Sequence, residues 1–292
     1  MTHMKKRTKT LIGLTLFTSL ALAGCSSAQD AAAPATDKKD SAAQTQAQAV
    51  DLKQPIADYR TYVIEQADAL IASTTQFVNA VKSGNIEEAK KLYAPTRQYY
   101  ERIEPIAEAF DNLDPDVDAR ENDVDASEWK GFHKIEKALW EANTTKGEEQ
   151  TADELLSNVQ LLRAKVETAD IEPALFVTGP VELLNEVSAT KVTGEEERYS
   201  HTDLYDFAAN VEGADKIFTL LQSTLKAHDA QLTDTIASRF ADLNNALSKY
   251  KKDSGYVSYT ELSKEQTKEL SQAVDALAEP LSQMGTVLGA NK

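Results

Sequence analysis

The fold of this chain is restricted most by long apolar stripes with helical spacing. The first stripe advances in steps of three and four residues and consists of Tyr59, Val63, Ala67, Leu70, Thr74, Phe77 and Val81. This spacing places the side chains on one face of an α-helix, which Gly84 would end. From about Leu52 onward, the period-two alternation typical of strands is nearly missing. The pattern therefore predicts an all-α fold.

Similar stripes predict further helices along the chain. They are expected at about 85–93, 95–110, 127–142, 151–168, 179–189, 202–226, 229–251 and 260–288. Asn85 and Ser127 are suited to cap the helices that begin at these residues. Pro95 is suited to the first turn of the helix at 95–110, and Thr151 starts a capping box for the helix at 151–168. Eight or nine helices with short connections are typical of helix bundles and are enough for two packed four-helix bundles.

The first 24 residues have the features of an export signal. A basic start, 5–9, precedes a short apolar run, 11–21, and Leu22-Ala23-Gly24-Cys25 follows. The run is shorter than the roughly 20 residues that span a bilayer. Because it ends in a lipobox, we expect Cys25 to carry lipid, such as palmitate, and to become the mature N-terminus. The protein would then be extracytoplasmic and anchored to the cell membrane.

Cys25 is the only cysteine, so the mature chain has no disulfide and no thiolate metal site. Residues 25–50 are mainly Ala, Gln, Ser, Thr and Asp and cannot bury much apolar surface, so a disordered tether is expected there. The rest is expected to divide into an N-terminal helical bundle with a metal site, 51–145, and a C-terminal helical bundle, 146–292.

The charge of the chain restricts its partners. The formal net charge is −16, and the signal carries four positive residues and no acids, so the mature chain is near −20. Nucleic acid is an improbable partner, because its phosphates require a basic surface. Acidic surfaces usually serve solubility, but they are also compatible with collecting cations.

The segment GFHKIEKALW, residues 131–140, contains the most suggestive histidine. His133 and Glu136 stand three apart on a helix, so both side chains can reach one point in space. Alone, this spacing is more typical of a solvated helix face, because chance produces it often. Large apolar residues around the pair favour partial burial, and a buried ionisable group needs a partner, a metal or a shifted pKa.

Carboxylates accumulate just before this helix. Glu101, Glu104 and Glu108 form a stripe, which Arg97 and Arg102 would neutralise if it were exposed. The acidic segment 111–125 is expected to be a loop; its acids up to residue 123 are Asp111, Asp114, Asp116, Asp118, Glu121 and Asp123. One imidazole with several carboxylates is a hard, oxygen-rich ligand set that suits iron, manganese, calcium or zinc, and not copper(I).

Three segments carry a resemblance to a known family. They are RQYYERIEPIAEAFDNLDPDVDAREND, GFHKIEKALW and KVTGEEERYSHTDLYDFAANVEGA. In this order they closely resemble the imelysin-like EfeO and EfeM proteins, over about residues 52–290. The resemblance implies an all-helical extracytoplasmic protein of two four-helix bundles. It also implies service in an iron-uptake system, with a membrane permease and a haem-type peroxidase as partners.

The resemblance also implies site residues. His133 and Glu136 would be metal ligands, joined by Glu101, Glu104 and Asp118. Glu108 would support the site from outside the ligand set. In GEEERYSHTDLYDF, Glu195, Glu196, His201 and Asp203 have no secure role and are candidates for a supporting or structural one. The chain lacks the cupredoxin domain of many EfeO proteins, since Met284 is its only methionine after the signal, so it resembles the EfeM type.

Three functions remain open at this point. The first is capture of iron outside the membrane and delivery to a permease, which requires no enzymatic step. The second is a metallopeptidase, although the chain has no His-Glu-x-x-His motif. The third is metal-bridged binding of a cell-surface polysaccharide, in a cleft lined by aromatics such as Tyr99, Tyr100, Trp129 and Tyr205.

Overall fold

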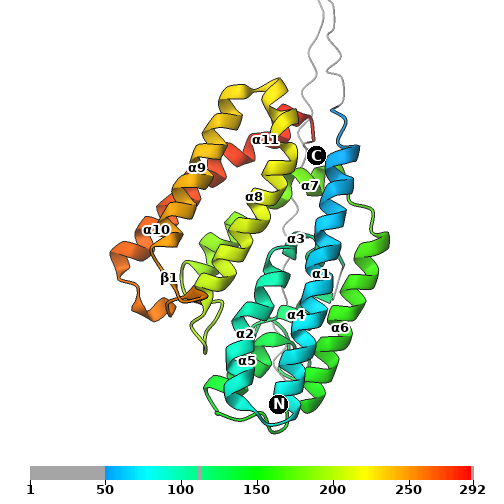
Figure 1. Ribbon diagram of the computed structural model, residues 1–292, viewed down its shortest axis with the longest axis vertical. Coiled ribbons are helices and arrows are strands. Elements are labelled where there is room, and N and C mark those ends of the chain that lie inside the picture. Colours follow the sequence, from blue (N-terminus) through cyan, green and yellow to red (C-terminus); the bar gives the residue numbers. More distant parts are fainter. Residues whose placement is uncertain (1–49, 111–112, 291–292) are drawn as a thin grey trace, which may run out of the picture. The chain divides into compact units, whose positions relative to one another are not determined.

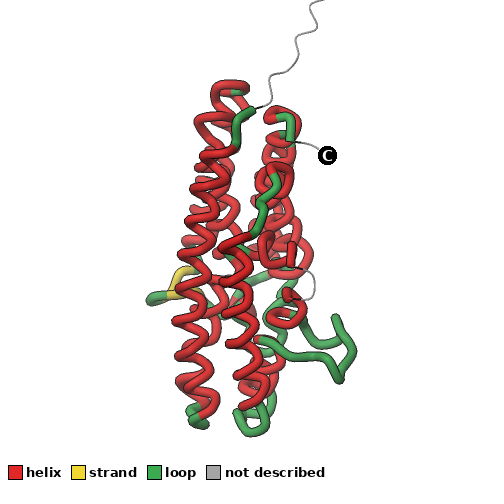
Figure 2. Tube along the Cα trace, turned by 90° about the vertical axis from the view of Figure 1, so that its right-hand side faces the viewer, coloured by secondary structure: helices red, strands yellow, loops and turns green. Residues whose placement is uncertain are grey.

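The computed structural model describes residues 50–110 and 113–290 (Figure 1). The expected signal, the expected lipid-attachment residue Cys25 and nearly all of the expected tether lie outside these residues, as does Asp111 of the acidic segment. Within the described part, helices dominate and the only strands are β1 (Lys251–Lys252) and β2 (Gly255–Tyr256), which form one small antiparallel hairpin (Figure 2). The prediction of an all-α fold is confirmed.

The first group of helices forms around the stripe that begins at Tyr59. Helix α1 (Lys53–Lys82) buries this whole stripe, and it packs along α2 (Ile86–Glu101) and α6 (Glu149–Thr168). The short helix α5 (Phe132–Trp140) packs against α2 and α6. Burial of one apolar face per helix therefore holds this group together.

The second group follows in the sequence. It contains α7 (Pro173–Glu186), α8 (Asp203–His228), α9 (Ala230–Ser248), α10 (Lys264–Ser282) and α11 (Met284–Leu288), with the short turn η3 (Tyr259–Glu261) before α10. Helix α8 packs between α7 and α9, and α10 packs on α9 and α7. Figure 1 shows these helices beside one another, with α1, α2 and α6 forming the other group. The prediction of two packed four-helix bundles is confirmed.

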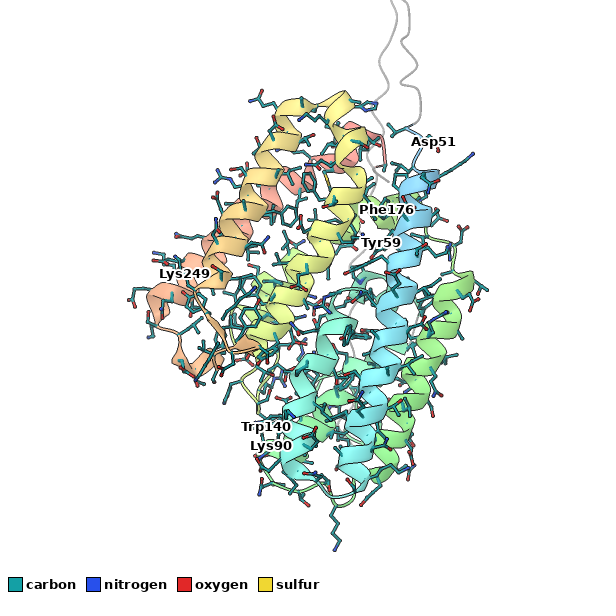
Figure 3. The ribbon with its side chains drawn as sticks, in the orientation of Figure 1. Asp51, Tyr59, Lys90, Trp140, Phe176 and Lys249 are labelled. Atoms are coloured by element: carbon teal, nitrogen blue, oxygen red, sulfur yellow. The ribbon has the colours of Figure 1, made fainter. Side chains whose placement is uncertain are left out.

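The two groups pack against each other along α2 and α8. Gly213 of α8 allows this close approach, because a Cβ there would lie 2.5 Å from the carbonyl oxygen of Arg102. Tyr59 of α1 and Phe176 of α7 make a second contact, with ring centroids 5.1 Å apart (Figure 3). Shared core residues therefore connect the groups within residues 50–290, and the domain boundary near residue 145 stays a prediction.

Several helix limits differ from the expected ones. Helix α2 continues through Pro95, because the residues on either side are buried and packing outweighs the loss of one backbone hydrogen bond. Asn85 caps α2 as predicted, by accepting from the Glu88 amide at 3.2 Å. Ser127 caps nothing; α5 starts after Gly131. Helix α6 begins at Glu149, two residues before the expected start at Thr151.

The acidic segment is more helical than expected. After α2, the chain forms α3 (Glu104–Ala107), η1 (Glu108–Phe110) and α4 (Leu113–Asp118). Leu113 and Val117 are buried, and α4 packs on α6, so apolar contacts outweigh the turn preference of its aspartates. A wide π-helical turn, η2 (Val187–Lys191), extends α7. In the described residues, no helix combines the length and the hydropathy that crossing a membrane requires.

Candidate metal centre

A charged cluster lies buried where α2, α5 and α8 meet. Its members with fully or almost fully buried side chains include eight carboxylates, which are Glu101, Glu104, Asp118, Glu136, Glu196, Glu197, Asp203 and Asp206. Facing them are two permanent cations, Arg97 and Lys191, and one histidine, His133. Burial penalises uncompensated charge, so this excess of carboxylates favours protons or a bound cation.

His133 and Glu136 contact each other on α5. Nδ1 of His133 lies 3.0 Å from Oε2 of Glu136. The other oxygen of Glu136 accepts from the amides of Tyr199 at 3.0 Å and Ser200 at 2.7 Å. Both oxygens of Glu136 are therefore engaged, and Nε2 of His133 is left as the free, buried ring nitrogen without a hydrogen bond.

Two carboxylates face this free nitrogen. Asp118 Oδ1 lies 3.6 Å and Glu196 Oε1 3.5 Å from Nε2 of His133. One ligand atom from each of the three side chains falls within 4.8 Å of the others. Ligands held at about 2.1 Å from one ion are about 3.0–3.4 Å apart, so a small contraction would let all three bind a single metal.

A glycine keeps Asp118 beside His133. Gly131 precedes α5 with a φ of +88°, and a Cβ there would lie 2.3 Å from the carbonyl oxygen of Val117. Only glycine accepts both the backbone angle and this contact. The end of α4 can therefore touch the start of α5, which brings the two side chains together.

Arg97 lies inside the cluster and not on an exposed surface. It donates to Asp118 through Nη1 and to Glu101 through Nη2 at 2.6 Å, and its Nε pairs with Glu197 at 2.5 Å. Its Nη2 also lies 3.6 Å from Glu196 Oε1. The guanidinium therefore contacts the same two carboxylates that face His133. Arg102 does lie near the surface, where it pairs with Glu212 at 2.7 Å.

Glu101 and Glu104 form a second part of the cluster. Lys191 Nζ lies 3.1 Å from Glu101 Oε2 and 3.6 Å from Glu104 Oε2. The amide of Asn210 donates to both carboxylates, at 3.1 and 3.0 Å. These two predicted ligands are thus buried and close together, but they are paired with Lys191 and Asn210, and Glu101 also with Arg97.

The other residues singled out from the sequence lie at different depths. Glu108 is exposed, and one of its carboxylate oxygens lies near Glu104 and Glu186. Glu195 is exposed and lies 3.7 Å from Arg198. Asp203 is buried at the start of α8 and accepts from the Glu197 amide at 3.1 Å. The His201 carbonyl accepts from the Tyr259 amide at 2.9 Å.

An acidic groove of about 240 Å³ leads from solvent to the cluster. Its acids are Glu104, Glu108, Asp114, Asp118, Asp123, Glu186 and Glu196. Arg120 lies across this groove, with contacts to Glu196 at 2.9 Å and Asp123 at 3.0 Å. The negative lining would attract cations toward the buried carboxylates.

The protonation of the cluster follows from burial and charge. Burial is the main cause that raises the pKa of Asp118 to about 7, against the lowering effect of Arg97. Burial and Arg97 lower the pKa of His133, but contacts with Glu136 and Glu196 outweigh them and raise it to about 10. Burial also raises the pKa of Glu104 well above its usual range, despite Lys191. Without a metal, these three side chains therefore retain protons at higher pH than free side chains of the same types do.

The aromatic residues suggested for polysaccharide binding are dispersed. Tyr100 is fully buried in the core. Trp129 lines a surface hollow of about 740 Å³, whereas Tyr99 lines another of about 390 Å³. Tyr205 packs against Tyr256 with ring centroids 5.5 Å apart. In the described part of the chain, the four residues therefore share no hollow.

Several members of the cluster were not assigned from the sequence. Glu196 was noted without a role, and Glu197, Asp206, Lys191 and Asn210 were not considered as part of the site. The unusual run GEEERYSHTDLYDF was the available signal, since it places acids and a helix start together. Only folding shows that this run lies against α5.

Comparisons with known proteins agree with this architecture. The family model Peptidase_M75, described as Imelysin, matches residues 55–284. A relative from Staphylococcus haemolyticus (strain JCSC1435) is 43% identical over 287 residues, covering 96% of this chain and 99% of the relative. Relatives from Staphylococcus aureus strains MRSA252 and NCTC 8325 are 47% and 46% identical over 246 residues, covering 81% of this chain and 86% of each. All three are named Efem/EfeO family lipoprotein. The chain therefore belongs to the imelysin family and to the EfeM/EfeO family of lipoproteins.

Proposed function

We infer that this protein is a lipid-anchored, extracytoplasmic iron-binding component of an Efe-type uptake system. It captures iron and passes it to a membrane permease, with a haem-type peroxidase as a further partner. It is not an enzyme in this role. The lipoprotein names of its relatives support the anchor, and the expected lipobox at Cys25 supplies the attachment point.

The observation that carries this proposal is the excess of buried carboxylates. Eight of them share the cluster with two permanent cations and one histidine. A multivalent cation would relieve their repulsion, and carboxylate oxygens with one imidazole suit iron, with manganese, zinc or calcium as competitors. No covalent chemistry is required, since capture needs only affinity for the ion and an access route from solvent to the cluster.

Within the cluster, the roles follow from which side chains face the free ring nitrogen of His133. His133 through Nε2, Asp118 and Glu196 are the first ligands of the ion. Glu136 positions the imidazole by accepting from Nδ1, an arrangement common around metal-binding histidines. Glu101 and Glu104 complete the set when their present cation partner moves away. The groove lined by Glu108 and Glu186 is the route for the ion.

Metal analysis followed by titration tests the proposal. The purified protein is stripped with a chelator and titrated with ferrous iron without oxygen, ferric citrate, Mn²⁺ and Zn²⁺ in a calorimeter. We expect one tight iron site and weaker binding of Mn²⁺. A protein that takes up no iron in either oxidation state under these conditions would not be an iron carrier.

A peptidase remains a second candidate because the matching family model carries a peptidase name. Casein hydrolysis with and without chelator distinguishes the two functions. We expect no hydrolysis above a heat-treated control. Chelator-sensitive hydrolysis that disappears in His133→Ala would instead support the peptidase.

A further inference from the structure

Lys191 is a fully buried lysine among carboxylates. Its Nζ lies 3.1 Å from Glu101, 3.6 Å from Glu104 and 3.2 Å from Glu186, yet it makes no hydrogen bond of good geometry. The ammonium thus neutralises charge without directional bonds. This is how a metal ion would act at the same position.

The carboxylates around Lys191 are held in place by other groups. Asn210 donates to both Glu101 and Glu104, and Arg97 donates to the second oxygen of Glu101. Because these donors come from α8 and α2, the two carboxylates would keep their positions if Lys191 moved away. Glu101 and Glu104 therefore do not depend on Lys191 for their positions.

The backbone around Lys191 is suited to movement. Lys191 is the last residue of the π-helical turn η2, where the Val192 amide donates to Val187 at 2.8 Å. Such wide turns often occur at functional sites, and a lysine side chain is long and flexible. Glu186 is only partly buried and lines the acidic groove, so it offers the ammonium a partner nearer to solvent.

We propose that Lys191 is a built-in competitor of the metal, which holds Glu101 and Glu104 in the empty protein and moves toward Glu186 when a multivalent cation binds. The inference rests on the proposed metal-binding function. A divalent or trivalent ion is attracted to these carboxylates more strongly than an ammonium group is, because its charge is higher. A monovalent ion carries the same charge as the ammonium and has no such advantage. Lys191 therefore makes the site select multivalent over monovalent ions. It also lowers the affinity of the protein for the bound ion enough to allow release.

Lys191→Met tests this role, because methionine is an unbranched side chain of nearly the same length and carries no charge. We expect Lys191→Met to bind Mn²⁺ and ferrous iron about tenfold more tightly or better, with slower release to a chelator, since a competing charge is lost. Lys191→Arg keeps a cation and should stay within about threefold of the wild type. Lys82→Met removes a surface lysine that pairs with Asp153 and should change nothing.

The fold of the variant is checked separately. Without metal, Lys191→Met should unfold at a lower temperature than the wild type, and Mn²⁺ should raise that temperature by more than it does in the wild type. If Lys191→Met is folded and binds Mn²⁺ no better than the wild type, the proposal is overturned. If it is unfolded without metal and Mn²⁺ does not restore its helical circular dichroism, the proposal is overturned as well.

The two proposals fail in distinguishable ways. Wild-type protein that binds metal and loses it in His133→Ala, combined with unchanged affinity in Lys191→Met, removes only the role of Lys191. Absence of binding in both the wild type and Lys191→Met removes the metal-binding function and this role together.

Discussion

Glu136 holds the imidazole of His133 through Nδ1, with 3.0 Å between Oε2 and the ring nitrogen. Because a carboxylate can only accept there, Nδ1 carries a proton, and Nε2 is the ring nitrogen that a cation would bind once the imidazolium loses its second proton. The spacing of the two residues on one helix face therefore produces a positioned ligand and its support. They need not be two equal ligands.

Replacement of His133 should remove the imidazole ligand. We expect His133→Ala to lose at least about a hundredfold in iron affinity while its circular dichroism stays helical, because Asp118 and Glu196 alone form an incomplete site. Calorimetric titration measures the affinity. His228→Ala is the matched control, since His228 is exposed at the end of α8 and bonds only a backbone carbonyl of its own helix. Equal affinity in His133→Ala and His228→Ala would show that His133 is not a ligand.

Glu136→Gln should have a smaller effect than loss of His133. The amide still reaches the ring, but it supplies no negative charge to support an imidazole that faces a metal. Outer partners of this kind typically change metal affinity by about 10- to 100-fold. Titration of both variants under the same conditions provides the comparison. A loss in Glu136→Gln as large as in His133→Ala would favour direct ligation by Glu136.

Gly131→Ala should separate α4 from α5. The new Cβ would meet the Val117 carbonyl at 2.3 Å, so Asp118 must move away from His133. We expect weaker metal binding and a lower thermal midpoint, including about 1–2 kcal/mol from the left-handed backbone. Gly147→Ala is the control, because Gly147 has a φ of +97° but no atom within 4 Å of a Cβ. If both variants bind metal equally well, the contact at Val117 does not matter for the site.

Arg120→Ala should open the groove. Arg120 lines the groove and bonds Glu196 and Asp123, so its removal leaves the lining more negative and the groove wider. We expect faster uptake of Mn²⁺ in stopped-flow measurements at low salt, and a smaller difference at high salt. Arg163→Ala, which removes a surface arginine on α6, serves as control. Uptake at the wild-type rate in Arg120→Ala would place the entrance elsewhere.

The empty protein should become less stable as pH rises from about 5 to 8. Burial raises the pKa of Asp118 and Asp203 to about 7, well above the value of 3.8 for a free aspartate, so the folded state binds more protons in this range than the unfolded state does. His133, with a pKa raised to about 10, acts in the same direction above its free value of 6.5. Stability therefore falls with rising pH.

Bound metal should reverse this trend. The ion needs a deprotonated Asp118 and a neutral ring nitrogen, so protons compete with it and its affinity rises with pH. Thermal midpoints at pH 5.5 and 8, with chelator and with Mn²⁺, measure both effects. If the chelated protein is more stable at pH 8 than at pH 5.5, the buried carboxylates do not retain protons in the way described.

The class of fold and the His133–Glu136 pair of the proposed site are readable from the sequence alone. Helical apolar periodicity depends only on neighbours within a few turns, so the stripe from Tyr59 to Val81 identified α1 directly. The pairing of His133 with Glu136 was readable for the same reason, since residues three apart share a helix face. Glu101, Glu104 and Asp118 were identified as candidates by their place in the sequence and by family resemblance.

Which charged atoms converge depends on long-range packing. Glu196 comes from a loop more than sixty residues after His133, and Asn210 contacts Glu101 across 109 residues, so no local pattern could join them. Lys191 reaches Glu101 across a similarly long stretch of chain. Burial also changed the meaning of residues already noted. Arg97 reads as a surface partner in the sequence, but it lies at the centre of the cluster because α8 covers α2. Long-range packing sets both contacts and burial, and charge becomes decisive only where burial removes water.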